Sequence, residues 1–246
     1  MKDIDMNVKK TALITGANKG IGFAIARALA QKGLQVWVGA RDAERGQVAV
    51  DTLVAEGLDV RLLVIDVTDG DNVDAAGTLL STQIDSLDVL INNAGILGTT
   101  AQPSLVRIDD LKEVYEVHVF GPIRVTQAFV PLLKAAKGAR VVMMSSGLGS
   151  LGLVTDPTSI YSKANFLAYN SSKTALNAVT VAFAKELGPL GIMVNAVEPG
   201  SVATDLNGNN GALTPTEGAQ SAVDMAMIGA DGPRGGFFGV HGRQPW

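Results

Sequence analysis

Cysteine is absent from this sequence of 246 residues. Its absence excludes disulfides, thiolate nucleophiles and thiolate metal sites, and it fits a reducing compartment. An excess of charge of one sign is missing as well, because 20 basic residues oppose 24 acidic ones and the basic residues are scattered. A nucleic-acid-binding protein would concentrate basic residues in a patch. We therefore expect no disulfide, no metal site and no nucleic-acid partner.

Long hydrophobic runs are also missing. Every apolar run stops well short of the roughly 18 residues that a membrane span requires. Residues Met1–Lys10 mix acids with lysines and contain no apolar core, so they do not form a signal peptide. These observations predict a cytoplasmic protein without a membrane segment. Because there is no repeat, linker or break in composition, residues 1–246 are expected to form a single domain.

Short apolar β-rich runs alternate with longer helical segments along the chain. Strands are expected at Thr11–Thr15, Gln35–Ala40, Val60–Ile65, Leu87–Ile91, Arg140–Met144 and Ile192–Val197. Helices are expected at Ile21–Gln31, at about Ala43–Glu56 and about Asn72–Ile84, and within Leu111–Ala136 and Leu167–Leu187. This alternation predicts an α/β fold, a single doubly wound parallel sheet with helices on both faces, as in Rossmann-like proteins. The Asn- and Gly-rich region Ser201–Pro215 is expected to be a loop, either an active-site lid or a plain surface excursion.

The first expected strand runs directly into a glycine-rich turn, Thr15–Gly22, and a helix follows. Glycines in this place permit a tight turn and a close approach to phosphate, while the helix N-terminus offers free N–H groups. The spacing is G-x-x-x-G-x-G rather than the G-x-G-x-x-G fingerprint, so its position in the first βα unit is what favours a dinucleotide. The residues expected to bind it are Gly16, Asn18, Lys19, Gly20, Ile21 and Gly22.

The end of the second strand bears on which cofactor is used. An acid there would bind the adenosine ribose of NAD, whereas a basic residue accommodates the 2′-phosphate of NADP. Ala40 occupies the acid position, and Arg41 and Lys19 can converge on a phosphate. We therefore favour NADPH over NADH. Asp42 is the rival feature, because it can contact the ribose or cap the following helix.

Polar and small residues follow the third and fourth strands. Asp66 and Val67 are candidates for the adenine edge of the cofactor. The segment Asn92–Gly95 suits close packing against a dinucleotide, which predicts contacts from Asn93, Ala94 and Gly95. For Asn92, a structural role that joins neighbouring strands is the favoured interpretation.

Three side chains near the later strands suit proton transfer to a carbonyl group. Tyr169 and Lys173 are four residues apart, so they lie on one helix face. A free tyrosine has a pKa of about 10, and a nearby ammonium lowers it toward a useful value. Ser146 can donate a hydrogen bond to a substrate carbonyl. Because a Y-x-x-x-K pair is common by chance, the ordered set of motifs carries more weight than the pair.

The ordered set resembles the short-chain dehydrogenase/reductase family over nearly the whole chain. The matching elements are Thr15–Gly22, Asp66, Asn92–Gly95, Ser146, Tyr169 with Lys173, and Pro199–Thr204, in family order. Asn18–Phe23 and Gly235–Phe238 further resemble the carbonyl-reductase branch.

The resemblance implies NADPH-dependent reduction of ketones or aldehydes, or the reverse oxidation, of a small-molecule substrate. It makes Tyr169 the general acid and Ser146 the group that polarises the carbonyl. Lys173 would bind the nicotinamide ribose and lower the pKa of Tyr169. The residues implied beside the nicotinamide carboxamide are Pro199, Gly200, Val202 and Thr204.

The stretch between Ser146 and Tyr169 is several residues longer than is common in the family, which is expected to reshape the pocket mouth. Tyr161 lies closer to the usual distance from Ser146, but its i+4 residue is Asn165 rather than a cation, so it is rejected as the acid. Family position predicts a mostly apolar substrate pocket formed by Leu97, Leu148, Leu153, Val154, Phe166 and Leu206, with Trp246 as a further candidate.

A second departure concerns a histidine. The family usually has an active-site asparagine three residues before a glycine, and this sequence has His118 three residues before Gly121. We expect His118 to replace that asparagine as a link in proton supply to Tyr169, with its pKa lowered by repulsion from Lys173. The alternative is that His118 only packs within its helix.

Two other functions remain open. A nucleotide-binding sensor or scaffold on the same fold is favoured only by the change at His118, and the intact Ser146, Tyr169 and Lys173 argue against it. An NAD-linked alcohol dehydrogenase would keep the chemistry and change the cofactor. The resemblance also implies a homo-oligomer, although the longer stretch before Tyr169 can interfere with assembly through helices.

Overall fold

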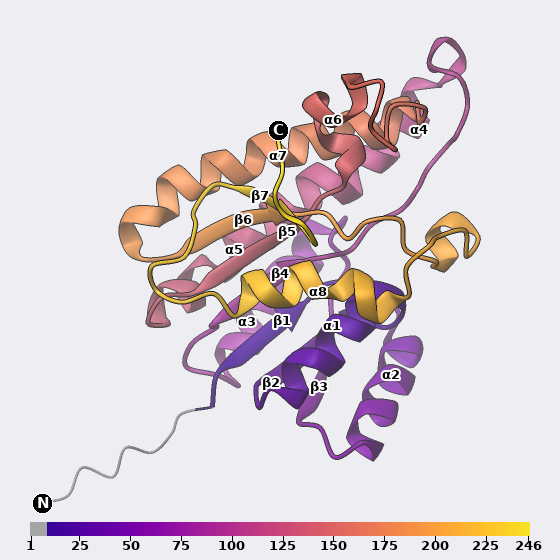
Figure 1. Cartoon of the computed structure of the whole chain (residues 1–246). Helices are drawn as coiled ribbons and strands as arrows, with labels where there is room; N and C mark the ends of the chain where they lie inside the picture. Colours follow the sequence, from indigo (N-terminus) through magenta and orange to yellow (C-terminus); the bar gives the residue numbers. More distant parts are fainter. Residues whose placement is uncertain (1–8) are drawn as a thin grey trace, which may run out of the picture.

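The computed structural model describes residues 9–246 of the chain (Figure 1). The prediction that Met1–Lys10 is no signal peptide concerns residues that lie almost entirely outside this range. Within the described residues, no helix combines the length and the apolar character needed to cross a membrane. The same part of the chain has no cluster of His, Asp and Glu side chains placed to hold a metal ion.

One sheet of eight strands forms the centre of the fold. The strands are β1 (Thr11–Ile14), β2 (Gln35–Ala40), β3 (Val60–Val64), β4 (Val89–Asn92), β5 (Arg140–Met144), β6 (Met193–Val197), β7 (Phe237–Gly239) and β8 (Gly242–Arg243). Their order is β3-β2-β1-β4-β5-β6-β7-β8, and every neighbouring pair is parallel except β7 with β8. The predicted mostly parallel α/β sheet is confirmed.

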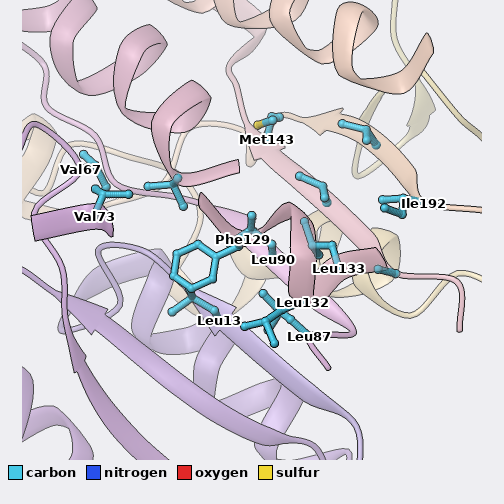
Figure 2. Close-up of a cluster of buried hydrophobic side chains, with 14 of the residues drawn as sticks. Leu13, Val67, Val73, Leu87, Leu90, Phe129, Leu132, Leu133, Met143 and Ile192 are labelled. Atoms are coloured by element: carbon cyan, nitrogen blue, oxygen red, sulfur yellow. The ribbon is translucent and has the colours of Figure 1, made fainter. Parts of the chain in front are cut away.

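Helices cover both faces of the sheet. They are α1 (Gly20–Gln31), α2 (Ala43–Ala55), α3 (Gly70–Ser81), α4 (Ile108–Tyr115), α5 (Gly121–Ala135), α6 (Leu151–Thr155), α7 (Leu167–Leu187) and α8 (Pro215–Ala226). One buried cluster joins the sheet to α3, α5 and α7, with Phe129 packed near Leu13 and Leu90 (Figure 2). A second cluster joins the opposite face to α1, α2 and α8. Strands covered on both faces are apolar throughout, which is why they appear in the sequence as continuous apolar runs.

The expected helix within Leu111–Ala136 is interrupted. Helix α4 ends at Tyr115, and Glu116–Phe120 forms a short π-helix before α5 begins. Pro122 has no N–H group, so the carbonyl of His118 loses the donor that it would have in an α-helix. Short π-helical turns are rare and often lie at functional sites. The interruption places His118 in the widened turn.

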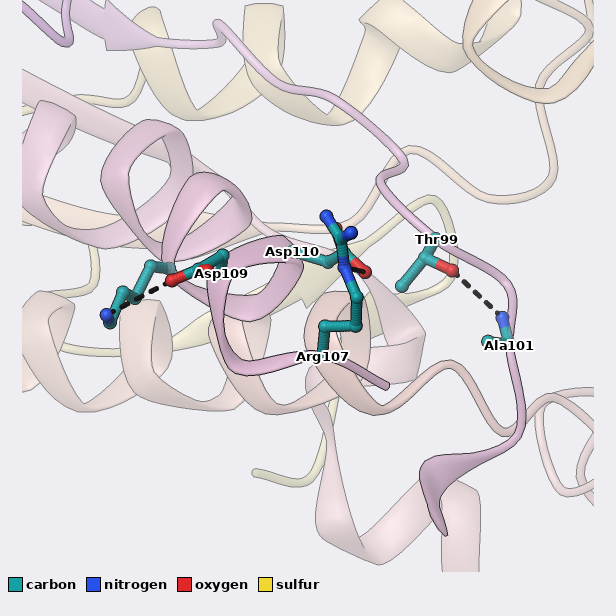
Figure 3. A network of polar contacts seen from close by, with 6 residues as sticks. Thr99, Ala101, Arg107, Asp109 and Asp110 are labelled. Carbon is teal, nitrogen blue, oxygen red and sulfur yellow. Dashed lines mark hydrogen bonds and ion pairs between the residues drawn. The ribbon is translucent and has the colours of Figure 1, made fainter. Parts of the chain in front are cut away.

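Short-range polar contacts order the chain where it enters α4 (Figure 3). Arg107 pairs with Asp110 at 2.9 Å, and the N–H of Ala101 donates to the hydroxyl of Thr99 at 3.2 Å. The ion pair is exposed, so it contributes little to stability. These contacts shape the connection that leads from the end of β4 to the π-helical turn.

Helix α8 had no prediction from the sequence. Its buried face is built mainly from small residues, among them Ala219, Ala222 and Ser221, which give only a weak apolar pattern. A capping box between Thr214 and Glu217 marks its start. This S/T-x-x-E pattern was the available signal.

The region Ser201–Pro215 is a loop, as expected, with local order of its own. The side-chain amide of Asn207 donates to the carbonyls of Val202 and Asn210. Val202 also forms an isolated bridge with Leu213. The loop therefore folds back on itself, and in Figure 1 it projects beyond the carboxyl ends of the strands.

Candidate active site

The carboxyl ends of β1 and β4 meet two of the predicted nucleotide segments. The glycine turn Thr15–Gly22 follows β1, and Asn93–Gly95 follows β4. Because the chain winds away from this point in both directions, a ligand crevice is expected between the two strands. The side chain of Asn93 donates to the carbonyls of Thr15 and Gly16 at 2.9 and 3.1 Å. These bonds hold the two segments together.

The glycine turn leaves its backbone open to a phosphate. Gly16 and Gly20 have φ angles of 64° and 58°, a conformation that residues with a Cβ rarely adopt. Helix α1 begins directly after Lys19, and within residues 9–246 no side chain caps its first turn and no acid lies there. Free N–H groups and the positive end of the helix dipole suit a pyrophosphate. The residues present therefore fit a dinucleotide.

The two asparagines at the end of β4, Asn92 and Asn93, form hydrogen bonds within the protein. Asn92 donates to the hydroxyl of Thr126 at 3.1 Å and approaches the sulfur of Met143 at 3.3 Å. This geometry agrees with the favoured structural interpretation of Asn92. The side-chain amide of Asn93 is likewise engaged, so contacts from Asn93 and Ala94 to a cofactor would come mainly from their backbone.

The candidates for cofactor choice take different positions. Asp42 caps α2 by accepting the N–H of Arg45 at 3.0 Å, so its capping role is the one observed. Arg41 is exposed at the end of β2. Lys19 forms an ion pair with Asp205 at 2.8 Å, and both side chains are more than half exposed. An exposed pair of this kind is weak, so a phosphate can compete for Lys19.

The remaining nucleotide candidates lie at the same edge of the sheet. Asp66 follows β3, and its Oδ1 accepts both the N–H and the hydroxyl of Thr68. Val67 is buried against Gly121, where a Cβ would come within 2.9 Å of the valine. Beyond β6, the methyl group of Thr204 lies close to Gly20. The loop after β6 thus reaches the glycine turn.

Ser146, Tyr169 and Lys173 come together where β5 ends against the start of α7. The hydroxyl of Ser146 accepts the N–H of Leu148 at 3.2 Å. The Nζ of Lys173 lies 5.7 Å from the centre of the Tyr169 ring and donates to the carbonyl of Met144 at 2.8 Å. The fold brings the three predicted catalytic residues to one place.

Burial moves both titratable groups toward their neutral forms. It raises the pKa of Tyr169 above the usual value, and a hydrogen bond with Ser146 acts in the opposite direction. It lowers the pKa of Lys173 to about 7. The expected lowering of the Tyr169 pKa by a Lys173 ammonium is therefore wrong for the protein by itself. Desolvation is the larger effect, and the Lys173 amino group is directed to a carbonyl.

His118 is only 1% exposed, and both of its ring nitrogens have partners. The N–H of Ile96 donates to Nε2 at 3.1 Å, and Nδ1 lies 2.9 Å from the hydroxyl of Ser172. Because Nε2 accepts, the neutral ring carries its hydrogen on Nδ1 and donates it to Ser172. Ser172 in turn donates to the carbonyl of Tyr169 at 2.8 Å. His118 therefore clamps the segment after β4 to the first turns of α7.

This arrangement does not support the expected role of His118 in proton supply. The chain of hydrogen bonds ends at a backbone carbonyl, which cannot pass a proton on. The imidazole meets the Tyr169 ring edge-on instead, with centroids 5.3 Å apart. The pKa of His118 is lowered far below its usual value, as predicted, but burial is the larger cause and Lys173 the second.

Tyr161 occupies a different position from the proposed acid. Its hydroxyl donates to the carboxylate of Glu198 at 2.8 Å. Burial first and then Glu198 raise its pKa further above the usual value. This geometry agrees with the rejection of Tyr161 as the acid. Glu198 was missed in the sequence, although an acid directly before Pro199 was a visible signal.

Two residues of the predicted substrate pocket lie beside α7. Leu148 and Val154 line a groove together with Ser171, Thr174 and Ala178 of α7. At 100° per residue, these α7 positions lie on the helix face opposite Tyr169 and Lys173. Leu148 and Val154 therefore lie along a different face of α7 from Tyr169 and Lys173.

The other pocket candidates differ in how far their side chains are exposed. Leu97, Leu153 and Phe166 are half-buried, whereas Leu206 is exposed. Trp246 stacks on Phe237 of β7 with ring centroids 5.7 Å apart. Its ring is thus held by the sheet.

Similarity to known proteins identifies the family. Residues 10–213 match the family model for short chain dehydrogenases. The chain belongs to the short-chain dehydrogenase/reductase family. It is 36% identical to the short-chain dehydrogenase anuI of Penicillium roqueforti, over 90% of each chain, and 30% identical to carbonyl reductase [NADPH] 1 of Rattus norvegicus, over 97% of this chain and 99% of the relative.

The solved structures agree with this assignment. The NADPH-bound carbonyl reductase from chicken fatty liver matches with a TM-score of 0.86 and 26% identity, over 97% of this chain and 99% of that one. The chain is therefore an oxidoreductase of the carbonyl-reductase-like branch, in a family that binds NAD(P).

The buried imidazole gives this short-chain dehydrogenase a pH-dependent stability. In the unfolded chain, His118 has a pKa of about 6.5, whereas the folded protein keeps the ring neutral. Below about pH 6.5 the unfolded state binds the extra proton, so the free energy of unfolding falls by up to about 1.4 kcal/mol per pH unit. Above that pH the contribution of His118 is complete. Urea unfolding at several pH values measures the slope.

Two variants test whether His118 causes this pH dependence of stability. His118→Asn keeps a donor and an acceptor without titrating, so it should flatten the slope and remain active. His118→Leu breaks both bonds and should lower turnover while NADPH affinity stays. His241→Asn is the matched control, because His241 is the other histidine and is exposed; its slope should equal that of the wild type. An unchanged slope in His118→Asn would contradict the assignment.

Proposed function

We propose that this protein reduces ketones or aldehydes with NADPH, or catalyses the reverse oxidation, with Tyr169 as the general acid/base. The observation that carries the proposal is the meeting of Ser146, Tyr169 and Lys173 at the sheet edge that also holds the glycine turn. A sensor without turnover has less support, because the clamp made by His118 preserves the catalytic turn of α7.

Each of the three side chains has a distinct task in this proposal. A bound nicotinamide supplies the hydride to the carbonyl carbon. Ser146 donates a hydrogen bond to the carbonyl oxygen and so polarises it. Tyr169 gives its phenolic proton to that oxygen, and its raised pKa keeps the proton available at neutral pH. In oxidation the same groups act in reverse.

Lys173 is the proposed contact to the cofactor beside Tyr169. Its pKa of about 7 means that charged and neutral forms coexist near neutral pH. By family resemblance it also binds the nicotinamide ribose. A second cation nearby would disfavour the ammonium, and neutral His118 avoids that conflict.

The preference for NADPH is proposed from the charges around the glycine turn. Arg41 is exposed next to Ala40, and Lys19 pairs with the exposed Asp205. The NADPH named for the rat and chicken relatives supports the same choice. The remaining cofactor contacts are proposed at Gly16, Asn18, Gly20, Ile21, Gly22, Asp66, Val67, Asn93, Ala94, Gly95, Pro199, Gly200, Val202 and Thr204.

The substrate proposed is a hydrophobic carbonyl compound or alcohol. Leu97, Leu153 and Phe166 remain candidates for the pocket, since each is half-buried. Leu206 is exposed on the loop after β6 and would contact a substrate as part of that loop.

The first test removes only the hydroxyl of the proposed acid. Tyr169→Phe should lower turnover about 10²–10⁴-fold, because general acid catalysis contributes a factor of that size. NADPH affinity should stay close to that of the wild type, since the ring remains. Steady-state kinetics with a panel of aryl ketones and aldehydes, together with NADPH titration, provide the measurement. A loss below about tenfold would falsify the role of Tyr169.

The second test concerns cofactor choice. Arg41→Ala should weaken NADPH binding about tenfold or more and leave NADH binding nearly unchanged, because a hydrogen bond to a charged group is lost. Fluorescence titration with both cofactors measures the difference. Lys32→Ala is the control, since it removes the same charge at the far end of α1. Equal losses for both cofactors, or a wild type that prefers NADH, would overturn the choice.

The ion pair of Lys19 offers a further arm of this test. Asp205→Asn frees Lys19 from its partner, so NADPH should bind more tightly and NADH should not. No change in the affinity for NADPH would mean that Lys19 does not reach the 2′-phosphate.

A further inference from the structure

A second tyrosine, Tyr161, is built into the site beside the proposed catalytic serine. It belongs to the long stretch between Ser146 and Tyr169. Its ring packs on Gly147, where a Cβ would come within 2.4 Å of two ring atoms. Only glycine therefore fits directly after Ser146 while the ring stays in place.

The partner of Tyr161 is a buried carboxylate. Glu198 is 7% exposed, and its Oε2 accepts both the Tyr161 hydroxyl at 2.8 Å and the N–H of Gly200 at 2.9 Å. Gly239 leaves room for the other oxygen, because a Cβ there would come within 2.3 Å of Oε1. Within residues 9–246, no ion pair of Glu198 is formed. Neutral donors thus hold this charge.

The position of Glu198 gives the pair its significance. Glu198 directly follows β6 and precedes Pro199 and Gly200, the turn proposed to flank the nicotinamide. Tyr161 lies at the other end of the bond, against the turn that carries Ser146. One hydrogen bond therefore connects the segment 156–166 to the cofactor turn.

We propose that Tyr161 and Glu198 are positioning residues that join the substrate-side wall of the pocket to the turn beneath the nicotinamide. The inference rests on the proposed carbonyl reduction. Tyr161 places the wall, and Glu198 holds both the wall and the Gly200 N–H. Tyr161 does not donate the catalytic proton, because its hydroxyl is committed to Glu198 and its pKa is raised by burial and by that carboxylate.

The two residues should act on different constants. Tyr161→Phe keeps the ring and breaks the bond, so KM for the ketone should rise about tenfold, the usual effect of losing a hydrogen bond to a charged group. Turnover and NADPH affinity should stay within about threefold of the wild type. Glu198→Leu frees both donors, so the Kd of NADPH should rise together with KM.

The pairing itself is measured by a double-mutant cycle. In the Glu198→Leu background, Tyr161→Phe should cause no further rise in KM, because their bond is already lost. Glu198→Gln retains an amide oxygen that can accept both donors, so it should recover most of the lost function. Tyr115→Phe is the matched control for removing a hydroxyl, since Tyr115 is also half-buried and ends α4. Tyr115→Phe should leave KM, turnover and the Kd of NADPH unchanged.

A second readout separates this inference from the proposed function. Hydrogen exchange of segment 156–166 should become faster in Tyr161→Phe and Glu198→Leu but not in Tyr115→Phe, whether or not a substrate is turned over. Suppose that the wild type reduces no carbonyl compound but the two variants still exchange faster in segment 156–166. That result would overturn the proposed function and leave the inference standing. Independent, additive effects on KM, or unchanged KM and exchange in Tyr161→Phe, would overturn the inference.

Discussion

The contact between the end of β5 and the first turns of α7 is the constraint on which the site depends. A Cβ on Gly149 would come within 2.7 Å of the backbone of Lys173, so glycine is needed for this approach. The amino group of Lys173 bonds to Met144, and Asn177 bonds to Gly149 and Ser145. These bonds place the turn that holds Ser146 beside Tyr169. Without this approach, Ser146 would not lie beside Tyr169 and Lys173, the other two proposed catalytic residues.

Burial in this contact sets the charge of the whole site. Burial disfavours the phenolate of Tyr169, the ammonium of Lys173 and the imidazolium of His118. It therefore raises the pKa of Tyr169 and lowers the pKa values of Lys173 and His118, so that each neutral form is favoured. His118 then serves as a neutral clamp with one donor and one acceptor. The Glu198 side chain accepts hydrogen bonds from the Tyr161 hydroxyl and from a backbone N–H.

Sequence reasoning succeeded where a pattern is local. The strands Gln35–Ala40 and Arg140–Met144 have the predicted bounds, and α7 spans the range within which a helix was expected, because the apolar pattern lies within each segment. The helix around His118 was harder to predict from the sequence, because Pro122 is accompanied by a widened helical turn rather than by the end of the helix. The prediction for Leu148 rested on family position, which does not reveal which face of α7 a longer connection follows.

The sequence by itself determined the alternation of strands and helices, the glycine turn, and the pairing of Tyr169 with Lys173 on one helix face. These features follow from chain geometry over a few residues. Only the tertiary structure decided the partners of His118, the direction of the Tyr169 pKa shift and the bond between Tyr161 and Glu198. Such properties depend on burial and on donors brought from distant segments, and no spacing along the chain contains that information.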